Sequence, residues 1–316
     1  MRKKNKHNEH SYDIIRVFLN GGDVMRFVVV PNSLSELERY EEKKVNTFIL
    51  GLEDYCVNYP SVSLERIKEL SKKYSLFIAI NKNIFNSELD DIKKKLLELV
   101  NLPIMGVMFY DLGILNIVID NKINIPLVWH QTHMVTNYNT CNFYYDKGVE
   151  YGYLANEITL EEMIEIKNKT KMKLLVECFG YPIMSHSRRS LVTNYFKSID
   201  SNKEDRNYTL SDNENNYIIK ENNSGTSILF GKVINGTRPL FDLITNNFSF
   251  GILDMQNIEI DTGLEVLDKF NYIKDNIDTI SDKEKEDIIT YMNNLIGDST
   301  NFFYTKTIYK VKKGDK

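Results

Sequence analysis

Short apolar runs alternate with amphipathic stretches from Met25 onward. The runs RFVVV (26–30), TFILGL (47–52) and LFIAI (76–80) are rich in β-branched and aromatic residues, and each precedes a polar turn and a segment with helical spacing of its apolar residues. Continuous apolar runs are typical of strands buried on both faces of a parallel sheet. The alternation therefore predicts repeated β–α units around such a sheet.

Further apolar runs continue the series and place the last strand late in the chain. They lie at residues 105–110, 127–129, 152–155, 174–176 and 250–255. This fairly even spacing predicts an α/β fold, a (β/α) barrel of the TIM type, in which the final run closes the barrel. An open, doubly wound sheet is the alternative.

The chain changes character after Phe196. A polar, Asn-rich segment is followed by YIIKENNSGTSILFGKV (217–233), which predicts a β-hairpin with its turn at residues 222–225. We interpret residues from about 198 to 235 as a polar, β-rich insertion in a barrel domain of residues 25–290. The basic residues 1–24 are predicted to be a poorly ordered extension, and residues 291–316 an edge strand and tail.

Composition narrows the class of protein. The chain has 316 residues, of which 42% are hydrophobic, and its 3 cysteines lie far apart, which argues against a disulfide framework and favours a reducing cytoplasm. The N-terminal segment lacks the apolar core of a signal peptide, and no stretch approaches the roughly 20 apolar residues of a membrane span. The formal net charge of -4 neither implies nor excludes a nucleic-acid partner.

Polar side chains follow most of the predicted strands. The residues at these strand ends are Glu53, Asp54, Asn81, Asn83, Asp111, His130, Gln131, Asn156, Glu157 and Glu177. Because the carboxyl ends of barrel strands meet at one mouth, these side chains predict a mouth lined with carboxylates and amides.

The densest polar cluster follows the strand that ends at Glu177. Ser187, Arg188 and Arg189 come shortly after a Gly-Tyr-Pro turn, and this combination suits an anionic ligand, with surface ion pairs as the alternative for the two arginines. A serine-hydrolase elbow is absent here. Cys178 would face away from the mouth if Glu177 faces it, so we interpret it as a packing residue.

The segment after Trp129 offers hydrogen-bonding groups and no metal pattern. His130 and His133 would face opposite sides of a strand, so no metal site is predicted, whereas His130 and Gln131 are candidates for contacting a ligand. Asn137 and Asn142 lie in an amide- and aromatic-rich stretch that could hold a base or could serve as helix caps. No glycine-rich phosphate loop follows a strand, so nucleotide cofactors are not indicated.

Two long segments resemble peptidase family U32, the collagenase-like peptidases. They are TNYNTCNFYYDKGVEYGYLANEITLEEMIEIK (136–167) and ECFGYPIMSHSRRSLVTNYF (177–196). The positions that match the family motifs are Asn137, Glu157, Ile158, Thr159, Glu177, Phe179, Arg189, Leu191, Asn194 and Tyr195.

The resemblance and the strand ends together predict the site residues. We expect Glu177, Glu157 and Arg189 to act in catalysis. Substrate-binding residues are expected to be Asp111, His130, Gln131, Asn137, Asn142, Ser187, Arg188 and Tyr195. Many members of the family carry cysteines in the 177–196 loop, where this chain has Ser185 and Ser190, so we expect no iron–sulfur cluster bound by cysteines.

The resemblance implies more than one function. The family carries a peptidase label, while other members hydroxylate a tRNA wobble uridine or ribosomal RNA, some of them as pairs of subunits. The short, cysteine-poor form resembles the smaller partner of the tRNA-hydroxylating pair. The first hypothesis is therefore wobble-uridine 5-hydroxylation by a cluster-free subunit, with tRNA, a cysteine-bearing paralogue and a small anionic donor as its partners. The alternatives are a metal-independent peptidase that acts on peptides through Glu177 or Glu157, and a non-catalytic binding subunit.

Overall fold

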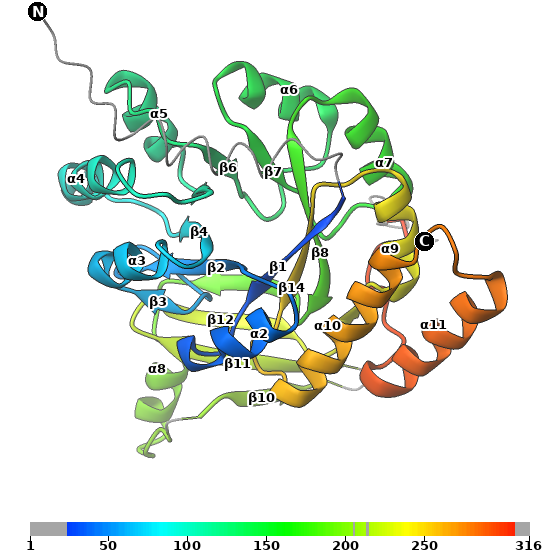
Figure 1. The fold of residues 1–316 in the computed structure, drawn as a ribbon. Helices are drawn as coiled ribbons and strands as arrows, with labels where there is room; N and C mark the ends of the chain where they lie inside the picture. Colours follow the sequence, from blue (N-terminus) through cyan, green and yellow to red (C-terminus); the bar gives the residue numbers. More distant parts are fainter. Residues whose placement is uncertain (1–23, 205, 213–214, 307–316) are drawn as a thin grey trace, which may run out of the picture.

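Eight parallel strands close into a barrel in the computed structural model, which describes residues 24–204, 206–212 and 215–306 (Figure 1). The barrel strands are β1 (Arg26–Val30), β2 (Thr47–Leu52), β4 (Ser75–Ile80), β5 (Gly106–Phe109), β6 (Leu127–Trp129), β7 (Tyr151–Tyr153), β8 (Lys173–Gly180) and β14 (Phe250–Asp254). Strand β1 pairs with both β14 and β2, which closes the sheet. The predicted barrel is confirmed, and the alternative of an open sheet is wrong.

Helices connect successive strands on the outside of the barrel. They are α2 (Leu37–Glu42), α3 (Leu64–Leu70), α4 (Leu89–Leu99), α5 (Leu112–Asp120), α6 (Tyr138–Asp146), α7 (Leu160–Lys169), α9 (Thr237–Thr245) and α10 (Ile260–Asp275), and α11 (Asp282–Ile296) follows α10. Two short 3₁₀ turns precede α2 and α4, at Leu34–Glu36 and Asn86–Glu88. Strand β3 (Ser61–Val62) extends the sheet beside β2, and β13 (Ile234–Asn235) runs antiparallel to β8.

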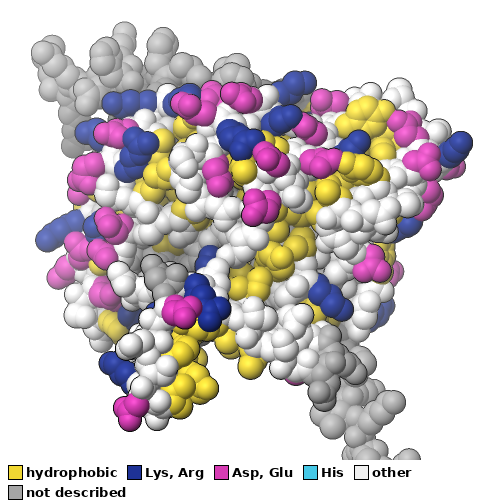
Figure 2. All heavy atoms as spheres, turned by 90° about the horizontal axis from the view of Figure 1, so that it is seen from below, with side chains coloured by type: hydrophobic (Ala, Val, Ile, Leu, Met, Phe, Trp, Pro, Cys, Tyr) yellow, Lys and Arg dark blue, Asp and Glu magenta, His cyan; other side chains and the backbone are white. Residues whose placement is uncertain are grey.

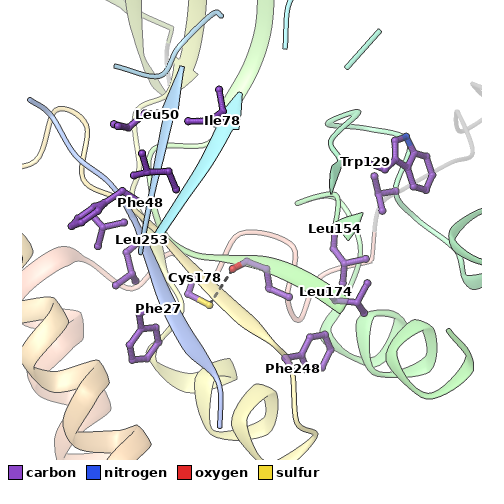
Figure 3. Packing of buried hydrophobic residues seen from close by; sticks show 14 of the residues in the cluster. Phe27, Phe48, Leu50, Ile78, Trp129, Leu154, Leu174, Cys178, Phe248 and Leu253 are labelled. Atoms are coloured by element: carbon purple, nitrogen blue, oxygen red, sulfur yellow. Dashed lines mark hydrogen bonds between the residues drawn. The ribbon is translucent and has the colours of Figure 1, made fainter. Parts of the chain in front are cut away.

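The side chains of each barrel strand alternate between two hydrophobic layers. Along β8, Leu174, Val176 and Cys178 belong to the layer between strands and helices, while Leu175 belongs to the barrel interior. Figure 3 shows Cys178 in that outer layer near Leu253. Because successive residues of a strand face opposite sides, Glu177 is directed to the interior side of the barrel wall. Cys178 therefore packs, as predicted.

Aromatic rings fill the barrel interior near the amino ends of its strands. The ring centroid of Phe77 lies 5.6 Å from that of Tyr151 and 5.6 Å from that of Phe250, both in edge-to-face geometry. All three rings are buried. This packing closes the interior at one end, so the polar cavity described below opens at the other.

A second, antiparallel sheet interrupts the barrel between β8 and α9. It consists of β9 (Ile183–Ser187), β10 (Tyr208–Ser211), β11 (Asn216–Asn222) and β12 (Gly225–Phe230), with helix α8 (Leu191–Ser198) beside it. The predicted hairpin is confirmed, with Asn222 paired to Gly225 at its turn. We refer to β9–β12 with α8 as the insertion. It begins at Ile183, earlier than the predicted start at about residue 198, because β9 lies in the polar segment that the sequence predicts to be a loop.

The end of the chain differs from the predicted boundary. Helix α11 runs to Ile296, past position 290, and residues 301–304 form turns, while much of the segment predicted as an edge strand and tail lies outside the described residues. Most of the predicted N-terminal extension (1–23) and the tail from 307 lie outside the described residues. None of the described helices is both long and apolar enough to cross a membrane.

Gly180 is required where β8 leaves the barrel. Its φ of 134° is unfavourable for other residues, and a Cβ atom there would lie 2.6 Å from the Cβ and 2.8 Å from the carbonyl oxygen of Asp254. We expect Gly180→Ala to lower the free energy of unfolding by about 3 kcal/mol or more, measured by chemical denaturation. Gly148→Ala is the matched control, because Gly148 also has a positive φ but open space around it. Its cost should be about 1 kcal/mol, and an equal cost at the two sites would contradict this account.

Candidate functional site

A cavity of about 270 Å³ lies between the carboxyl ends of the barrel strands and strand β9 of the insertion. The residues that matter most for its chemistry are Tyr59, Lys82, His130, Tyr153, Asn156, Glu177, His186, Arg188 and Asp254. The barrel contributes the floor and the insertion contributes one wall. We call this space the catalytic cavity.

Glu177 and Asp254 form a carboxyl pair on the floor of the catalytic cavity. They come from neighbouring strands, since Glu177 of β8 pairs with Ile252 of β14, and each side chain is only 8% exposed. Burial, and then the charge of Asp254, raises the pKa of Glu177 to about 7. Hydrogen bonds from Asn156 and from the Tyr153 hydroxyl oppose this rise by stabilising the carboxylate.

The pKa of the second carboxyl group, that of Asp254, is also raised toward neutral pH. Burial raises the pKa of Asp254 to about 6, against hydrogen bonds from Gln256 and the charge of Lys220. The Gln256 amide nitrogen of the main chain donates to Asp254 Oδ1 over 2.9 Å. Two adjacent carboxyl groups with pKa values near physiological pH can accept and return a proton, which is the property of a general acid–base pair.

His130 adds an uncharged imidazole beside the carboxyl pair. Burial lowers the pKa of His130 to about 4, so the ring is neutral at physiological pH. Its ring centroid lies 4.5 Å from that of Tyr153, and its Nδ1 atom has no hydrogen-bond partner among the described residues. Buried polar atoms are normally paired. The bare Nδ1 therefore marks a position where a bound ligand can complete the hydrogen bonding.

Two cationic side chains, Lys82 and Arg188, line the catalytic cavity. The Arg188 guanidinium stacks over the ring of Phe85 at 3.9 Å and donates to the carbonyl oxygen of Asn83 over 3.4 Å. Lys82 also lines the cavity, but its ammonium group pairs with Glu88 at 2.9 Å. Arg188 is thus held at the rim by an exposed aromatic ring, where it can meet an anionic group of a ligand.

A buried carboxylate holds the loop that carries the two arginines. Glu221 of β11 accepts hydrogen bonds from the amide of Val192 over 2.7 Å and from the hydroxyl of Thr226 over 2.9 Å, and pairs with Lys203 at 2.8 Å. Burial by itself would raise the pKa of Glu221, but hydrogen bonds from Lys203, from the hydroxyl and amide of Thr193 and from Thr226 outweigh it and lower the pKa to about 2. The Thr226 hydroxyl oxygen also accepts a hydrogen bond from the Leu191 amide over 2.9 Å, at the first residue of α8.

The structure brings three of the predicted site residues together and gives local roles to others. Glu177, His130 and Arg188 line the catalytic cavity. The other strand-end and loop residues make local hydrogen bonds: Asp111 caps α5, Asn137 caps α6, Gln131 joins Trp129 to the carbonyl oxygen of Tyr110, and Asn142 donates to the carbonyl oxygen of Lys169.

Four further predicted residues lie outside the lining of the catalytic cavity. Arg189 is exposed, and Tyr195 is 59% exposed on α8. The Ser187 hydroxyl accepts a hydrogen bond from the Arg189 amide over 3.2 Å. Glu157 pairs with His133 at 3.1 Å in an adjoining pocket. The two glutamates predicted to act in catalysis are therefore in separate compartments.

Sequence reasoning did not select several residues that build the site. Asp254 ends β14 in the same way that Glu177 follows its predicted strand, so the strand-end rule could have found it. Asn156 was expected at the mouth as a strand-end residue, but its bond to Glu177 was not, and nothing in the sequence singles out Tyr153 as the second donor to Glu177. Lys220 reaches Asp254 only because β11 folds back over the barrel, which requires the tertiary structure.

The cysteines do not fit an iron–sulfur cluster. Cys141 and Cys178 lie in the layer between strands and helices, whereas Cys56 belongs to the barrel interior, and all three are buried. In the ranges that the structure describes, no group of three or more His, Cys, Asp or Glu residues could hold a metal ion.

Comparison with known proteins identifies a family and several similar proteins. The sequence profile of peptidase family U32 matches residues 39–306. The chain is 24% identical to tRNA hydroxylation protein P2 of Bacillus subtilis, over 89% of this chain and 98% of that protein. It is 23% identical to tRNA hydroxylation protein P1 of the same organism, over 48% of this chain and 37% of that protein. Among solved structures, a mutant tryptophan synthase alpha-subunit from Pyrococcus furiosus aligns with a TM-score of 0.40 at 9% identity, over 87% of this chain and 98% of that one.

The raised pKa of Glu177 predicts a dependence of stability on pH. Folding favours the protonated carboxyl group, so this contribution to stability is complete below the ordinary pKa of 4.5 and is lost as the pH rises through about 7. Glu177→Gln cannot ionise. Relative to the wild type, this variant should gain about 2 kcal/mol in unfolding free energy between pH 5 and pH 8, measured by denaturant titration.

Glu157→Gln is the control for this measurement, because the side chain of Glu157 is 48% exposed. Its stability should follow the wild type across the same pH range. A parallel pH dependence of Glu177→Gln and wild type would show that Glu177 titrates as an ordinary surface carboxyl group.

Proposed function

The chain belongs to peptidase family U32, and from this premise we propose that it takes part in the 5-hydroxylation of uridine in tRNA. The Bacillus subtilis protein that this chain matches over nearly its whole length is named a tRNA hydroxylation protein. Two shorter matches, from Bacillus subtilis and Haemophilus influenzae, carry the same kind of name. The target that we propose is the wobble uridine, with the catalytic cavity as the site that receives it.

One observation makes this cavity the proposed reaction site: the buried pair of Glu177 and Asp254 on its floor. A carboxyl group with a pKa of about 7 can hold a proton or a negative charge at little cost. Uracil offers an N–H group and carbonyl oxygens, which match a carboxyl group, the Asn156 amide and the bare Nδ1 of His130. A neutral heterocycle is also compatible with a floor that carries two acidic groups.

Arg188 gives the cavity a place for an anionic group. We propose that it contacts either a phosphate of the RNA or a small anionic donor of the hydroxyl group, at the rim and away from the carboxyl pair. The relatives include proteins named P1 and P2, and a second family member is the partner that we propose for this chain. The alternatives of a peptidase and of a non-catalytic binding subunit are not better supported than hydroxylation.

A strain that lacks the gene tests the proposal. Nucleoside mass spectrometry of bulk tRNA should show loss of 5-hydroxyuridine derivatives, restored by the wild-type gene. We expect Glu177→Gln to restore less than a tenth of the modification, because the proton-transferring carboxyl group is gone. Expression and thermal melting of the variant protein serve as the folding control.

The adjacent arginines provide a matched pair within the same experiment. Arg188→Ala should reduce the modification strongly because Arg188 lines the cavity, whereas Arg189→Ala should affect it much less because Arg189, which is also exposed, is not part of the lining. Unchanged nucleosides in the deletion strain, without a compensating paralogue, would refute the proposed function. Loss with Arg189→Ala alone would instead move the site to the outer surface of the insertion.

A further inference from the structure

A second pocket of about 220 Å³ adjoins the catalytic cavity. The two share a wall made of Thr132, His133, Asn156, Ile183 and Met184. The remaining lining of the second pocket consists of Glu157, Pro182, Phe230, Asn301 and Phe302. We call this space the side pocket. Because the same side chains line both spaces, the side pocket and the catalytic cavity are immediate neighbours.

Five chain segments far apart in the sequence line the side pocket. Strand β12 supplies Phe230, whose amide donates to the carbonyl oxygen of Pro182 over 2.9 Å and whose ring lies 6.1 Å from that of Tyr217. The C-terminal segment supplies Asn301 and Phe302. It is held against the barrel by a hydrogen bond from the Asn301 amide to the carbonyl oxygen of Asn156, over 3.0 Å. These hydrogen bonds join the side pocket to the barrel and to the insertion.

The apolar part of the side pocket leaves large side chains open to solvent. Met184 is 47% exposed on the wall between the two spaces, and the rings of Phe230 and Phe302 are only partly buried. On the face of the molecule that carries β10–β12, Figure 2 shows hydrophobic side chains running in a band between charged groups of both signs. Flat aromatic rings and a methionine side chain are surfaces on which a planar ring stacks.

The polar part of the side pocket selects for a ring with hydrogen-bonding edges. The Thr132 hydroxyl, the Asn301 side chain and the contact of the His133 ring with the Glu157 carboxyl group lie around the same space as the two phenylalanines. An aliphatic side chain of a protein partner would fill the apolar part and leave these polar groups without ligand contacts. A nucleobase satisfies both parts, because its faces are apolar and its edge carries donors and acceptors.

We propose that the side pocket binds the nucleobase next to the target uridine, stacked against Phe302 and Phe230 with its edge toward Thr132 and Asn301. This inference rests on the proposed function and adds a second base-binding position to it. Two neighbouring nucleotides are splayed apart, one base in each compartment, and Met184 separates them. The side pocket therefore contributes to RNA binding, with Phe302 as the residue that stacks on the base.

A double-mutant cycle tests the contact directly. The probe is a fluorescein-labelled, single-stranded RNA pentanucleotide with a central uridine flanked by purines, and the RNA is altered by an abasic residue on the 5′ or the 3′ side of the uridine. Fluorescence anisotropy at fixed salt gives Kd. Phe302→Ala should weaken binding of the intact RNA about tenfold, and one of the two abasic RNAs should bind the wild type about tenfold more weakly. Phe302→Ala should bind that abasic RNA no more weakly than it binds the intact RNA, because the contact is already lost.

Two further variants guard against an effect on folding. Tyr304→Ala is the matched control, since Tyr304 is 49% exposed on the same segment and does not line the side pocket. It should bind as the wild type does. Met184→Ala removes a second, exposed part of the pocket and should show the same coupling to the same abasic RNA as Phe302→Ala.

Each other outcome overturns the inference. If the losses of affinity from Phe302→Ala and from each abasic RNA are additive, neither flanking base contacts Phe302, and the side pocket binds neither of them. Loss of a co-purifying protein in the two pocket variants, with RNA binding unchanged, would make the side pocket a protein contact. Absence of RNA binding by the wild type also refutes the side-pocket assignment, whereas the proposed function stands or falls separately on the nucleosides of the deletion strain.

Discussion

Two carboxyl groups held side by side out of water are the constraint around which the mouth of this barrel is organised. Ionising both Glu177 and Asp254 in a buried place is unfavourable, so their neighbours must either neutralise charge or donate hydrogen bonds. Asn156 and Tyr153 donate to Glu177, and Gln256 donates to Asp254. The pKa values of about 7 and about 6 show that this compensation is incomplete, and the residual proton affinity is what makes the pair useful for chemistry.

The insertion completes this environment. Its strand β11 brings Lys220 to the side of Asp254, and its strand β9 forms a wall of the catalytic cavity. The hydroxyl of Ser224, near the hairpin turn, donates to the carbonyl oxygen of Cys56 over 2.9 Å and joins the insertion to the barrel. Gly180 allows the chain to leave β8 tightly against Asp254 and to start this wall. Shape, charge and access at the mouth therefore depend on the barrel and the insertion together.

The barrel was predictable because its strands are buried on both sides and therefore consist of apolar residues in sequence. Strand β9 was not, because IMSHS has no such run and is exposed or only partly buried in the structure. The strand-end rule found Glu177 and His130, but it could not distinguish them from Asp111, whose carboxylate accepts the hydrogen bond of the Gly113 amide over 2.8 Å. Arg188 lines the cavity and Arg189 does not. This difference depends on the turn after β9, and the sequence pattern around the two arginines does not predict it.

The most direct test of the account is the titration of Glu177 itself, followed by carbon-13 NMR of its labelled side-chain carboxyl group. The account predicts a pKa near 7 in the wild-type protein, and a lower pKa in Asp254→Asn, where the neighbouring negative charge has been removed. A carboxyl group that titrates near its ordinary value of 4.5, unchanged by that substitution, would contradict the claim that a coupled, buried pair forms the functional site.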